Sequence, residues 1–270
     1  MSDYTQKMAA QKRAAQCSNL GMSQRIPHLI AAVFLALLSL LKVDATENPG
    51  KLKVLFLGHD SKHHNSNEYC PLITAALAPD DIDIEYSTKV DSLNEQNLAR
   101  FDAVMLYANH GLISEEQLNA LIGFVEAGKG FVPVHCASAC FGRFPRFVSL
   151  VGARFKSHKS GVFRASIIAP QHPVMKGLAE FESWDETYVH GDHNADGRTI
   201  LMERVEGDTR EPWTWVRTQG KGRVFYTASG HDDRTWKEQG FQRLLRNGIV
   251  WSVGEARSKA WEESRNKSQK

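Results

Sequence analysis

Four apolar runs in the chain each lead to a histidine, and these runs end at His59, His110, His135 and His231. If the runs are parallel strands of one sheet, their histidines gather at its carboxyl edge, where open α/β sheets bind ligands. Imidazole is the commonest metal ligand in proteins and a proton carrier near pH 7. The pattern therefore predicts a site at this edge but does not define a reaction.

The polar segment 184–193 (WDETYVHGDH) adds carboxylates, a tyrosine and two further histidines. In an extended chain Glu186, Tyr188 and His190 project to the same side, because side chains alternate along a strand. A carboxylate combined with imidazoles suits zinc, manganese or iron. The alternative is a solvated polar loop, against which Trp184 argues because a large ring usually packs on something.

Two other loops carry candidate groups. His63 and His64 follow the first apolar run, and loops at strand ends often hold binding residues, although adjacent histidines in a loop are also commonly both exposed. Near the last run, Asp232 either orients His231 or caps the helix that follows.

Cys136 follows a strand directly, as the nucleophile of an elbow turn does. The match is poor, because such a turn needs small flanking residues and this chain has Val134 and Ser138 there. A small thiol packed under the site is the alternative for Cys136. His135 is the better candidate, as a ligand or an acid–base group.

The N-terminal region resembles a secretory signal. Leu29–Leu41 is uninterrupted and apolar, follows Arg25 and precedes small residues ending at Ala45. We expect cleavage after Ala45 and export to the periplasm or medium, without a stable membrane span afterwards; an uncleaved anchor is the alternative. The run is short for a membrane span.

Composition limits the classes of partner. Five of the 33 basic and two of the 31 acidic residues lie within 1–45, which leaves the remainder with a formal charge of −1. A nearly neutral chain without a basic stripe argues against nucleic acid as a partner. The three cysteines after residue 45 form no disulfide framework, and whether Cys136 and Cys140 are free is undetermined.

Strand and helix patterns alternate from residue 51 to 151. This alternation predicts an α/β fold, a three-layer, mainly parallel sheet with helices on both faces. Ser114 with Gln117 marks a capped helix, and 82–86 alternates as an edge strand does. We divide the chain into an extension with signal peptide (1–50), one domain (51–254) and a charged, frayed tail (255–270). Further strands are expected at 161–168, 199–205, 213–217 and 224–227, around a loop-rich stretch at 170–197, with a closing helix at 241–253.

Several motifs in this order resemble the ThuA-like (trehalose-utilisation) family over residues 51–254. They are GKGFVPVHCAS, LVGARFKSH, HPVMKGL, WDETYVH, GRVFYTASGHDDRTW and FQRLLRNGIVWSVG. The resemblance implies the fold of class I glutamine amidotransferases, which is flavodoxin-like. It also implies a role in disaccharide or glycoside catabolism through 3-keto sugars made by a partner oxidoreductase.

The same resemblance implies divalent-metal ligands at His135, Glu186, His190 and His231. His190 stands where some relatives have an acidic residue, which leaves the metal's identity open. Our hypothesis is a bound zinc, manganese or iron ion on the three histidines that polarises the carbonyl of a 3-keto-glycoside. Glu186 or Asp185 is then the general base, and Asp185 alone if the metal takes Glu186.

In this hypothesis Tyr188 and Trp184 contact the small carbohydrate substrate, and His59 and His64 form the opposite wall of the substrate site. Two alternatives remain: a non-catalytic sugar-binding or scaffolding module without metal, and a Cys136-dependent amidase on the same fold. A homo-oligomer is compatible with the sequence, which does not define the substrate.

Overall fold

The structure is a computed structural model that describes residues 50–268, so the predicted signal peptide lies outside the described part. Within that part, none of the helices combines the length and the apolar character that crossing a membrane requires.

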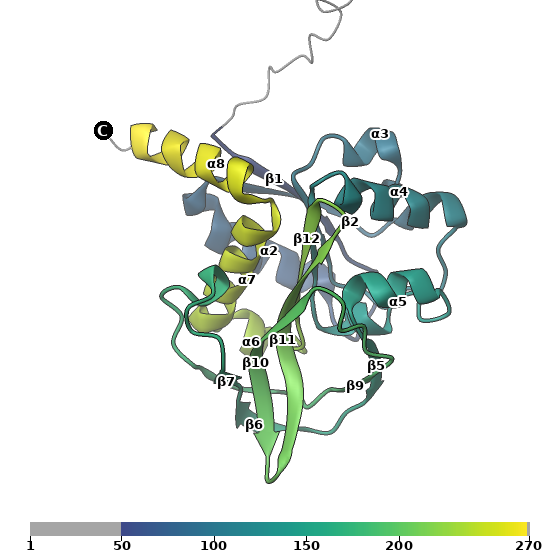
Figure 1. Cartoon of the computed structure of the whole chain (residues 1–270), viewed down its shortest axis with the longest axis vertical. Helices are drawn as coiled ribbons and strands as arrows, with labels where there is room; N and C mark the ends of the chain where they lie inside the picture. Colours follow the sequence, from purple (N-terminus) through teal and green to yellow (C-terminus); the bar gives the residue numbers. More distant parts are fainter. Residues whose placement is uncertain (1–49, 269–270) are drawn as a thin grey trace, which may run out of the picture. The chain divides into compact units, whose positions relative to one another are not determined.

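An eight-stranded mixed sheet forms the centre of the domain, in the order β2-β1-β3-β4-β12-β11-β10-β7 (Figure 1). Neighbouring strands from β2 through β12 run parallel, and the strands beyond β12 run antiparallel. The strands are β1 (Leu52–Leu57), β2 (Ile82–Ser87), β3 (Ala103–Leu106), β4 (Gly130–Pro133), β7 (Ser166–Ile167), β10 (Arg198–Glu206), β11 (Thr209–Gln219) and β12 (Gly222–Thr227).

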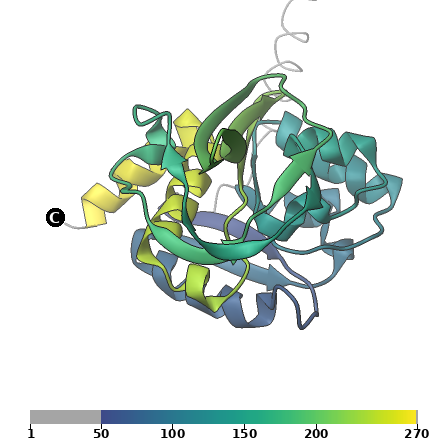
Figure 2. The ribbon, with the colours of Figure 1, turned by 90° about the horizontal axis from the view of Figure 1, so that it is seen from below.

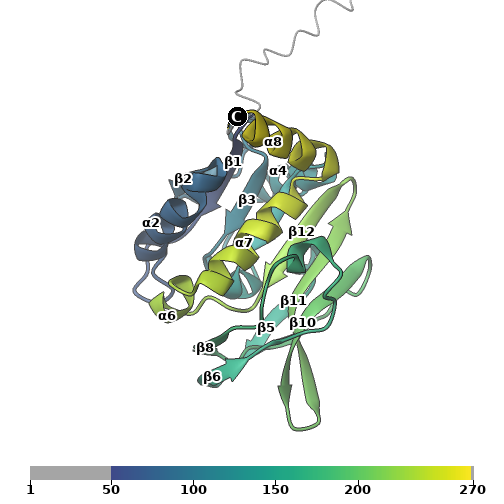
Figure 3. The ribbon, with the colours of Figure 1, turned by 90° about the vertical axis from the view of Figure 1, so that its left-hand side faces the viewer.

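Helices cover both faces of this sheet, which confirms the predicted three-layer α/β fold. One layer contains α2 (Ser66–Leu77), α6 (Asp233–Trp236), α7 (Gln239–Ser252) and α8 (Glu255–Ser268). The other contains α3 (Glu95–Leu98), α4 (Glu115–Glu126) and α5 (Pro145–Val151). Figure 2 shows the two layers from below, and Figure 3 shows α2 and α7 side by side in front of β1 and β3.

The local sequence explains these elements. Strands β3 and β4 are buried throughout, as strands covered on both faces must be, whereas β2 alternates and lies at the edge as predicted. Helix α4 begins with the predicted capping box. The Gln117 backbone N–H donates to Ser114 Oγ (3.2 Å), and the Ser114 backbone N–H donates to Gln117 Oε1 (2.9 Å).

The region between α5 and β10 differs from expectation. The predicted strand 161–168 is two strands, β6 (Ser160–Arg164) and β7. The first pairs with β8 (Glu182–Glu186), and the second pairs with β10 in the main sheet. The stretch predicted to be loop-rich contains β8 and β9 (Val189–Gly191). These form two small sheets outside the main one: β6 pairs with β8, and β5 (Arg154–Ser157) pairs with β9.

The predicted frayed tail is wrong, because residues 255–268 form α8. Its one apolar anchor, Trp261, is 1 % exposed and donates from Nε1 to the carbonyl of Asp80 (2.9 Å). Arg257 adds an ion pair with Asp102 at 2.9 Å. A single buried indole on an otherwise polar helix leaves no apolar periodicity in the sequence, so the pattern gave no sign of a packed helix.

Candidate metal centre

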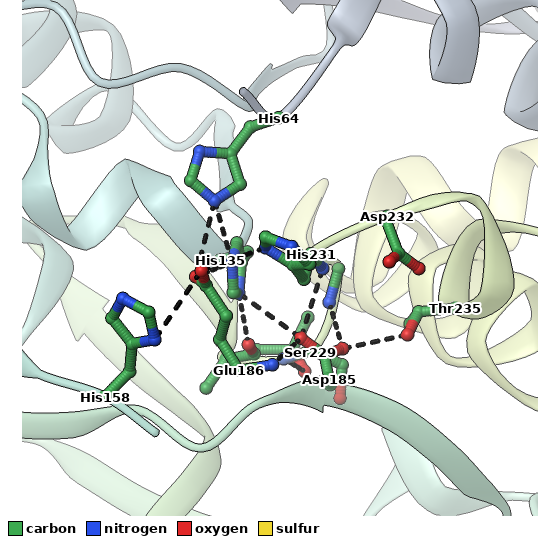
Figure 4. A network of polar contacts seen from close by, with 12 residues as sticks. His64, His135, His158, Asp185, Glu186, Ser229, His231, Asp232 and Thr235 are labelled. Carbon is green, nitrogen blue, oxygen red and sulfur yellow. Dashed lines mark hydrogen bonds and ion pairs between the residues drawn. The ribbon is translucent and has the colours of Figure 1, made fainter. Parts of the chain in front are cut away.

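Three imidazoles and one carboxylate converge at the carboxyl edge of the sheet (Figure 4). They are His64, His135, Glu186 and His231, and one ligand atom from each lies within 4.8 Å of all the others. The four runs that lead to histidines are strands β1, β3, β4 and β12 of one sheet, as predicted. The loop after β1 supplies His64, the turn after β4 supplies His135 and the turn after β12 supplies His231, while Glu186 ends β8.

The Glu186 carboxylate lies at the centre of the cluster. Its Oε2 is 3.2 Å from His135 Nε2 and 3.4 Å from His64 Nε2, and its Oε1 is 3.2 Å from His231 Nδ1. His135 Nε2 and His64 Nε2 are 3.2 Å apart. Bonds of about 2.0–2.1 Å to a tetrahedral ion place neighbouring ligand atoms roughly 3.3 Å apart. These donor types and spacings fit a divalent ion.

His135 is held in a conformation that few non-glycine residues adopt. It follows β4 as the first residue of the short helix η3 (His135–Ala139), with φ of 49°. Its Nδ1 is 2.6 Å from the carbonyl oxygen of Ala228, so Nδ1–H donates there and the Nε2 lone pair faces the cluster. The strained position at the strand end therefore belongs to His135 and not to Cys136.

Cys136 is poorly placed for nucleophilic chemistry. Its side chain is 1 % exposed, and burial raises the pKa of the thiol well above its usual value. Cys70, Cys136 and Cys140 are all free and buried. These observations argue against the amidase alternative.

Asp185 is fully buried and fixes the turn that carries His231. Its carboxylate accepts hydrogen bonds from the backbone N–H groups of Gly230 (2.8 Å) and His231 (3.1 Å) and from Thr235 Oγ1 (2.9 Å). Burial raises the pKa of Asp185, while these bonds and the nearby His135 act in the opposite direction. Because its oxygens are buried and already accept these hydrogen bonds, Asp185 is poorly placed for the predicted role of general base.

The charges within the cluster are strongly coupled. Burial alone would raise the pKa of Glu186, but hydrogen bonds to His135, His231 and His64 hold it far below its usual range. Burial lowers the pKa of His64 to about 4 despite its contact with Glu186. Burial would also lower the pKa of His231, but the bond to Glu186 outweighs it and raises this pKa. The cluster thus offers a carboxylate and neutral His64, as a cation site requires.

The structure does not place His190, a predicted ligand, in the cluster. Its Nδ1 is 3.1 Å from Glu211 Oε1, and its Nε2 is 2.9 Å from the Tyr226 hydroxyl. The expectation assumed one extended strand through Glu186 and His190. Strand β8 ends at Glu186 and β9 begins at Val189, so the alternation is broken between them.

The two aromatic residues predicted to contact substrate each lie against a histidine of the cluster. The Tyr188 ring is 2 % exposed and stacks on the His135 ring, with centroids 4.1 Å apart. The Arg234 guanidinium lies over the Trp184 ring at 3.6 Å from its centroid, and the centroids of the Trp184 and His231 rings are 5.5 Å apart. One indole face is therefore covered, which leaves no open platform for a sugar on that side.

His59 and His110 brace the loop that carries His64. His59 is buried, and its Nε2 is 2.9 Å from the His64 carbonyl oxygen. His110 Nε2 is 2.9 Å from the Gly58 carbonyl oxygen. His59 therefore does not form the substrate wall that was predicted, and His64 belongs to the cluster itself.

Sequence reasoning missed His158, which lies between β5 and β6. Its Nδ1 is 3.5 Å from Glu186 Oε1, and its side chain is 39 % exposed. The neighbouring Lys159 forms two hydrogen bonds with Thr187, which follows Glu186: the Thr187 backbone N–H donates to the Lys159 carbonyl (2.7 Å), and the Lys159 backbone N–H donates to Thr187 Oγ1 (3.2 Å). No apolar run leads to His158, so the strand-end pattern could not mark it.

Comparison with known families gives a match over residues 53–252 to the model described as ThuA, trehalose utilisation. No curated protein matches the chain.

Solved structures share the fold. A ThuA-like protein from Parabacteroides merdae aligns with a TM-score of 0.67 at 20 % identity, covering 75 % of this chain and 90 % of its own. A ThuA-like protein from Bacteroides uniformis aligns with a TM-score of 0.64 at 17 % identity, covering 77 % and 92 %. A β-galactosidase from Rahnella sp. R3 aligns with a TM-score of 0.52 at 14 % identity, covering 74 % of this chain but 31 % of its own.

Proposed function

The chain belongs to the ThuA (trehalose utilisation) family, and from this premise we propose that it is a metal-assisted enzyme of carbohydrate breakdown that cleaves 3-keto-disaccharides or related 3-keto-glycosides. One observation carries the proposal: three imidazoles and a carboxylate lie within 4.8 Å of one another at the ligand-binding edge of an α/β sheet.

His64, His135, Glu186 and His231 would hold the ion. A bound divalent ion such as zinc, manganese or iron supplies Lewis acidity toward a substrate carbonyl. His135 is enclosed, whereas the His231 side chain is 22 % exposed, so substrate reaches the cluster from the side of His231 and His158.

The chemistry is an elimination next to the keto group. A base removes the proton from the carbon between the carbonyl and the anomeric carbon, and the C–H electrons form a double bond as the glycosidic C–O bond breaks. The leaving oxygen then takes up a proton. With Glu186 in the cluster and Asp185 enclosed, the base falls to His158, whose Nε2 has no hydrogen-bond partner within residues 50–268.

The test is elemental analysis of the purified protein combined with turnover of 3-keto-trehalose, with and without a chelator. We expect about one divalent ion per chain and a loss of turnover that returns on adding the ion back. Equal turnover after complete metal removal contradicts the proposal. Sugar binding without metal or turnover would instead support a non-catalytic sugar-binding module.

Replacing His158 tests the assignment of the base separately. His158→Gln should lower kcat by at least about a hundredfold, because a positioned proton acceptor is lost, while the metal content stays at the wild-type level. His63→Gln, which changes an exposed histidine of another loop, is the matched control. Wild-type kcat in His158→Gln would assign the proton transfer to another group.

Export is a separate part of the proposal and rests on the sequence pattern of residues 22–45. N-terminal sequencing of the protein recovered from outside the cytoplasm should begin at Thr46. A sequence that begins at Met1 or Met22 would contradict cleavage.

A further inference from the structure

A chain of buried polar groups lies behind His135 and takes no part in the proposed reaction. Glu211 on β11 accepts from the His190 backbone N–H (2.9 Å) and contacts its Nδ1 (3.1 Å). His190 Nε2 is 2.9 Å from the Tyr226 hydroxyl on β12. That hydroxyl is also 3.1 Å from the His135 carbonyl oxygen and 3.0 Å from Ser138 Oγ.

The hydrogen-bond partners of Glu211, His190 and Tyr226 determine which of their atoms carry protons. Glu211 is ionised, because its bonds to His190 lower its pKa although burial alone would raise it. Its oxygen therefore accepts the His190 Nδ1 proton. Burial lowers the pKa of His190, so the ring is neutral and Nε2 accepts a hydrogen bond. The single Tyr226 proton then lies between two acceptors, His190 Nε2 (2.9 Å) and the His135 carbonyl oxygen (3.1 Å), which share it, so the hydroxyl links the His190 ring to the backbone of His135.

His135 needs such support. Its φ of 49° is a costly conformation for a residue other than glycine, and it persists only where the surroundings enforce it. The His135 ring is fixed by its hydrogen bond to the Ala228 carbonyl and by stacking on Tyr188. The His135 backbone carbonyl is contacted by the hydroxyl groups of Tyr226 and Ser138.

We propose that Glu211, His190 and Tyr226 are positioning residues that fix the left-handed turn of His135 and thereby aim its Nε2 at the metal. The inference rests on the proposed metal centre. His190 thus acts on the site from behind and not as a ligand.

Two substitutions of His190 form a matched pair. In His190→Gln the longer amide reaches the position of Nε2 and keeps the bond to Tyr226. In His190→Asn the shorter amide replaces Nδ1, keeps the bond to Glu211 and loses Tyr226. Tyr226→Phe removes only the hydroxyl, and Ser252→Ala removes a buried hydrogen bond of α7 (2.8 Å, to the Ile249 carbonyl) as a control remote from this chain of groups.

The first readout is titration of the metal-free full-length protein with Co²⁺, followed by its visible absorption, which reports coordination geometry. We expect His190→Asn and Tyr226→Phe to bind Co²⁺ about ten- to a hundredfold more weakly with an altered spectrum, because partners behind a ligand typically contribute that much. His190→Gln and Ser252→Ala should stay within about threefold of wild type. A purely structural role for His190 predicts equal losses in Gln and Asn.

The second readout needs no metal. The His135 Nδ1 proton, bonded to the Ala228 carbonyl at 2.6 Å, should give a protected downfield NMR signal. We expect it to shift in His190→Asn and Tyr226→Phe but not in His190→Gln or Ser252→Ala.

The outcomes separate the two proposals. If wild-type protein binds no Co²⁺, the metal-assisted function fails, and the NMR signal alone decides the positioning role. If wild type binds Co²⁺ but all variants match it in affinity and NMR signal, the positioning role is overturned. Complete loss of Co²⁺ binding in both His190 variants, but not in Tyr226→Phe, would make His190 a ligand and also overturn it.

Discussion

Two histidines of the cluster, His64 and His135, carry local strain. His64 and His135 both have positive φ, of 54° and 49°, and their Nε2 atoms face each other at 3.2 Å. His64 Nδ1 is buried and has no hydrogen-bond partner among the described residues. Local strain and unsatisfied polar atoms of this kind concentrate at binding sites, where a ligand compensates for them.

Acid should destabilise the metal-free protein through His64. Its pKa of about 4 in the folded state lies below the 6.5 of the unfolded chain, so the unfolded chain binds a proton first as pH falls. The stability contributed by the neutral ring is present above pH 6.5 and is lost toward pH 4. Between pH 7 and 5 we expect urea unfolding to show a loss of up to about 2 kcal/mol from this group.

The variant His64→Gln isolates this contribution, because it removes the titrating ring while the raised pKa of His231, which acts in the opposite direction, remains. The loss between pH 7 and 5 should shrink in His64→Gln and persist in the exposed control His63→Gln. An unchanged pH dependence in His64→Gln would show that other groups carry it.

At the same scale, the strand-end pattern pointed to part of the candidate cluster. It pointed to His135 and His231, because each follows a strand whose apolar run is visible in the sequence, whereas Glu186 was suggested by the density of polar groups in the segment 184–193. The ligand assignment of His190 did not hold, because the period of two stops where β8 gives way to β9. That break depends on which strands pair, and local sequence does not encode pairing.

Among the secondary-structure elements, helix α8 is the clearest example of one that the sequence did not predict. The alternation of strands and helices gave the three-layer fold, since each buried strand and capped helix has its own local signal. Helix α8 is held by Trp261 together with Arg257 and Arg265, which pair with Asp102 and Asp80. These partners lie more than 150 positions earlier in the chain, beyond the reach of any local pattern.

Removing the Trp261 side chain should therefore destabilise the whole domain. We expect Trp261→Ala to lower the free energy of unfolding by about 3 kcal/mol, because a fully buried indole and its hydrogen bond to Asp80 are both lost. Lys259→Ala, on the exposed side of the same helix, should change it by less than about 0.5 kcal/mol. Equal values in a urea titration would mean that α8 does not pack as described.

Over the whole molecule, the cluster joins segments that are distant in sequence. His64, His135 and His231 come from the parallel part of the sheet, whereas Glu186 comes from the small β6–β8 sheet. An ion bound to all four would link these parts and stabilise the folded state through mass action.

Binding should therefore raise the melting temperature. At a free ion concentration of 100 times Kd the gain is about 2.7 kcal/mol, which corresponds to roughly 5–10 °C for a domain of this size. Differential scanning calorimetry with and without Zn²⁺ or Mn²⁺ measures the shift, and a chelator should reverse it. Glu186→Gln, which removes the anionic ligand, should abolish most of the shift; a full shift in that variant would place the ion elsewhere.

Because Glu186 lies outside the main sheet, its position affects how fast a bound ion can leave the cluster. The β6–β8 ribbon is two strands wide, so its hydrogen bonds can open without disturbing the eight-stranded layer. Such a fluctuation withdraws Glu186 and loosens the turn of His231, which the adjacent Asp185 holds, and a captured ion or a spent product gains a way out. The rate at which a chelator strips the protein should then follow the breathing of this ribbon and remain far faster than global denaturation.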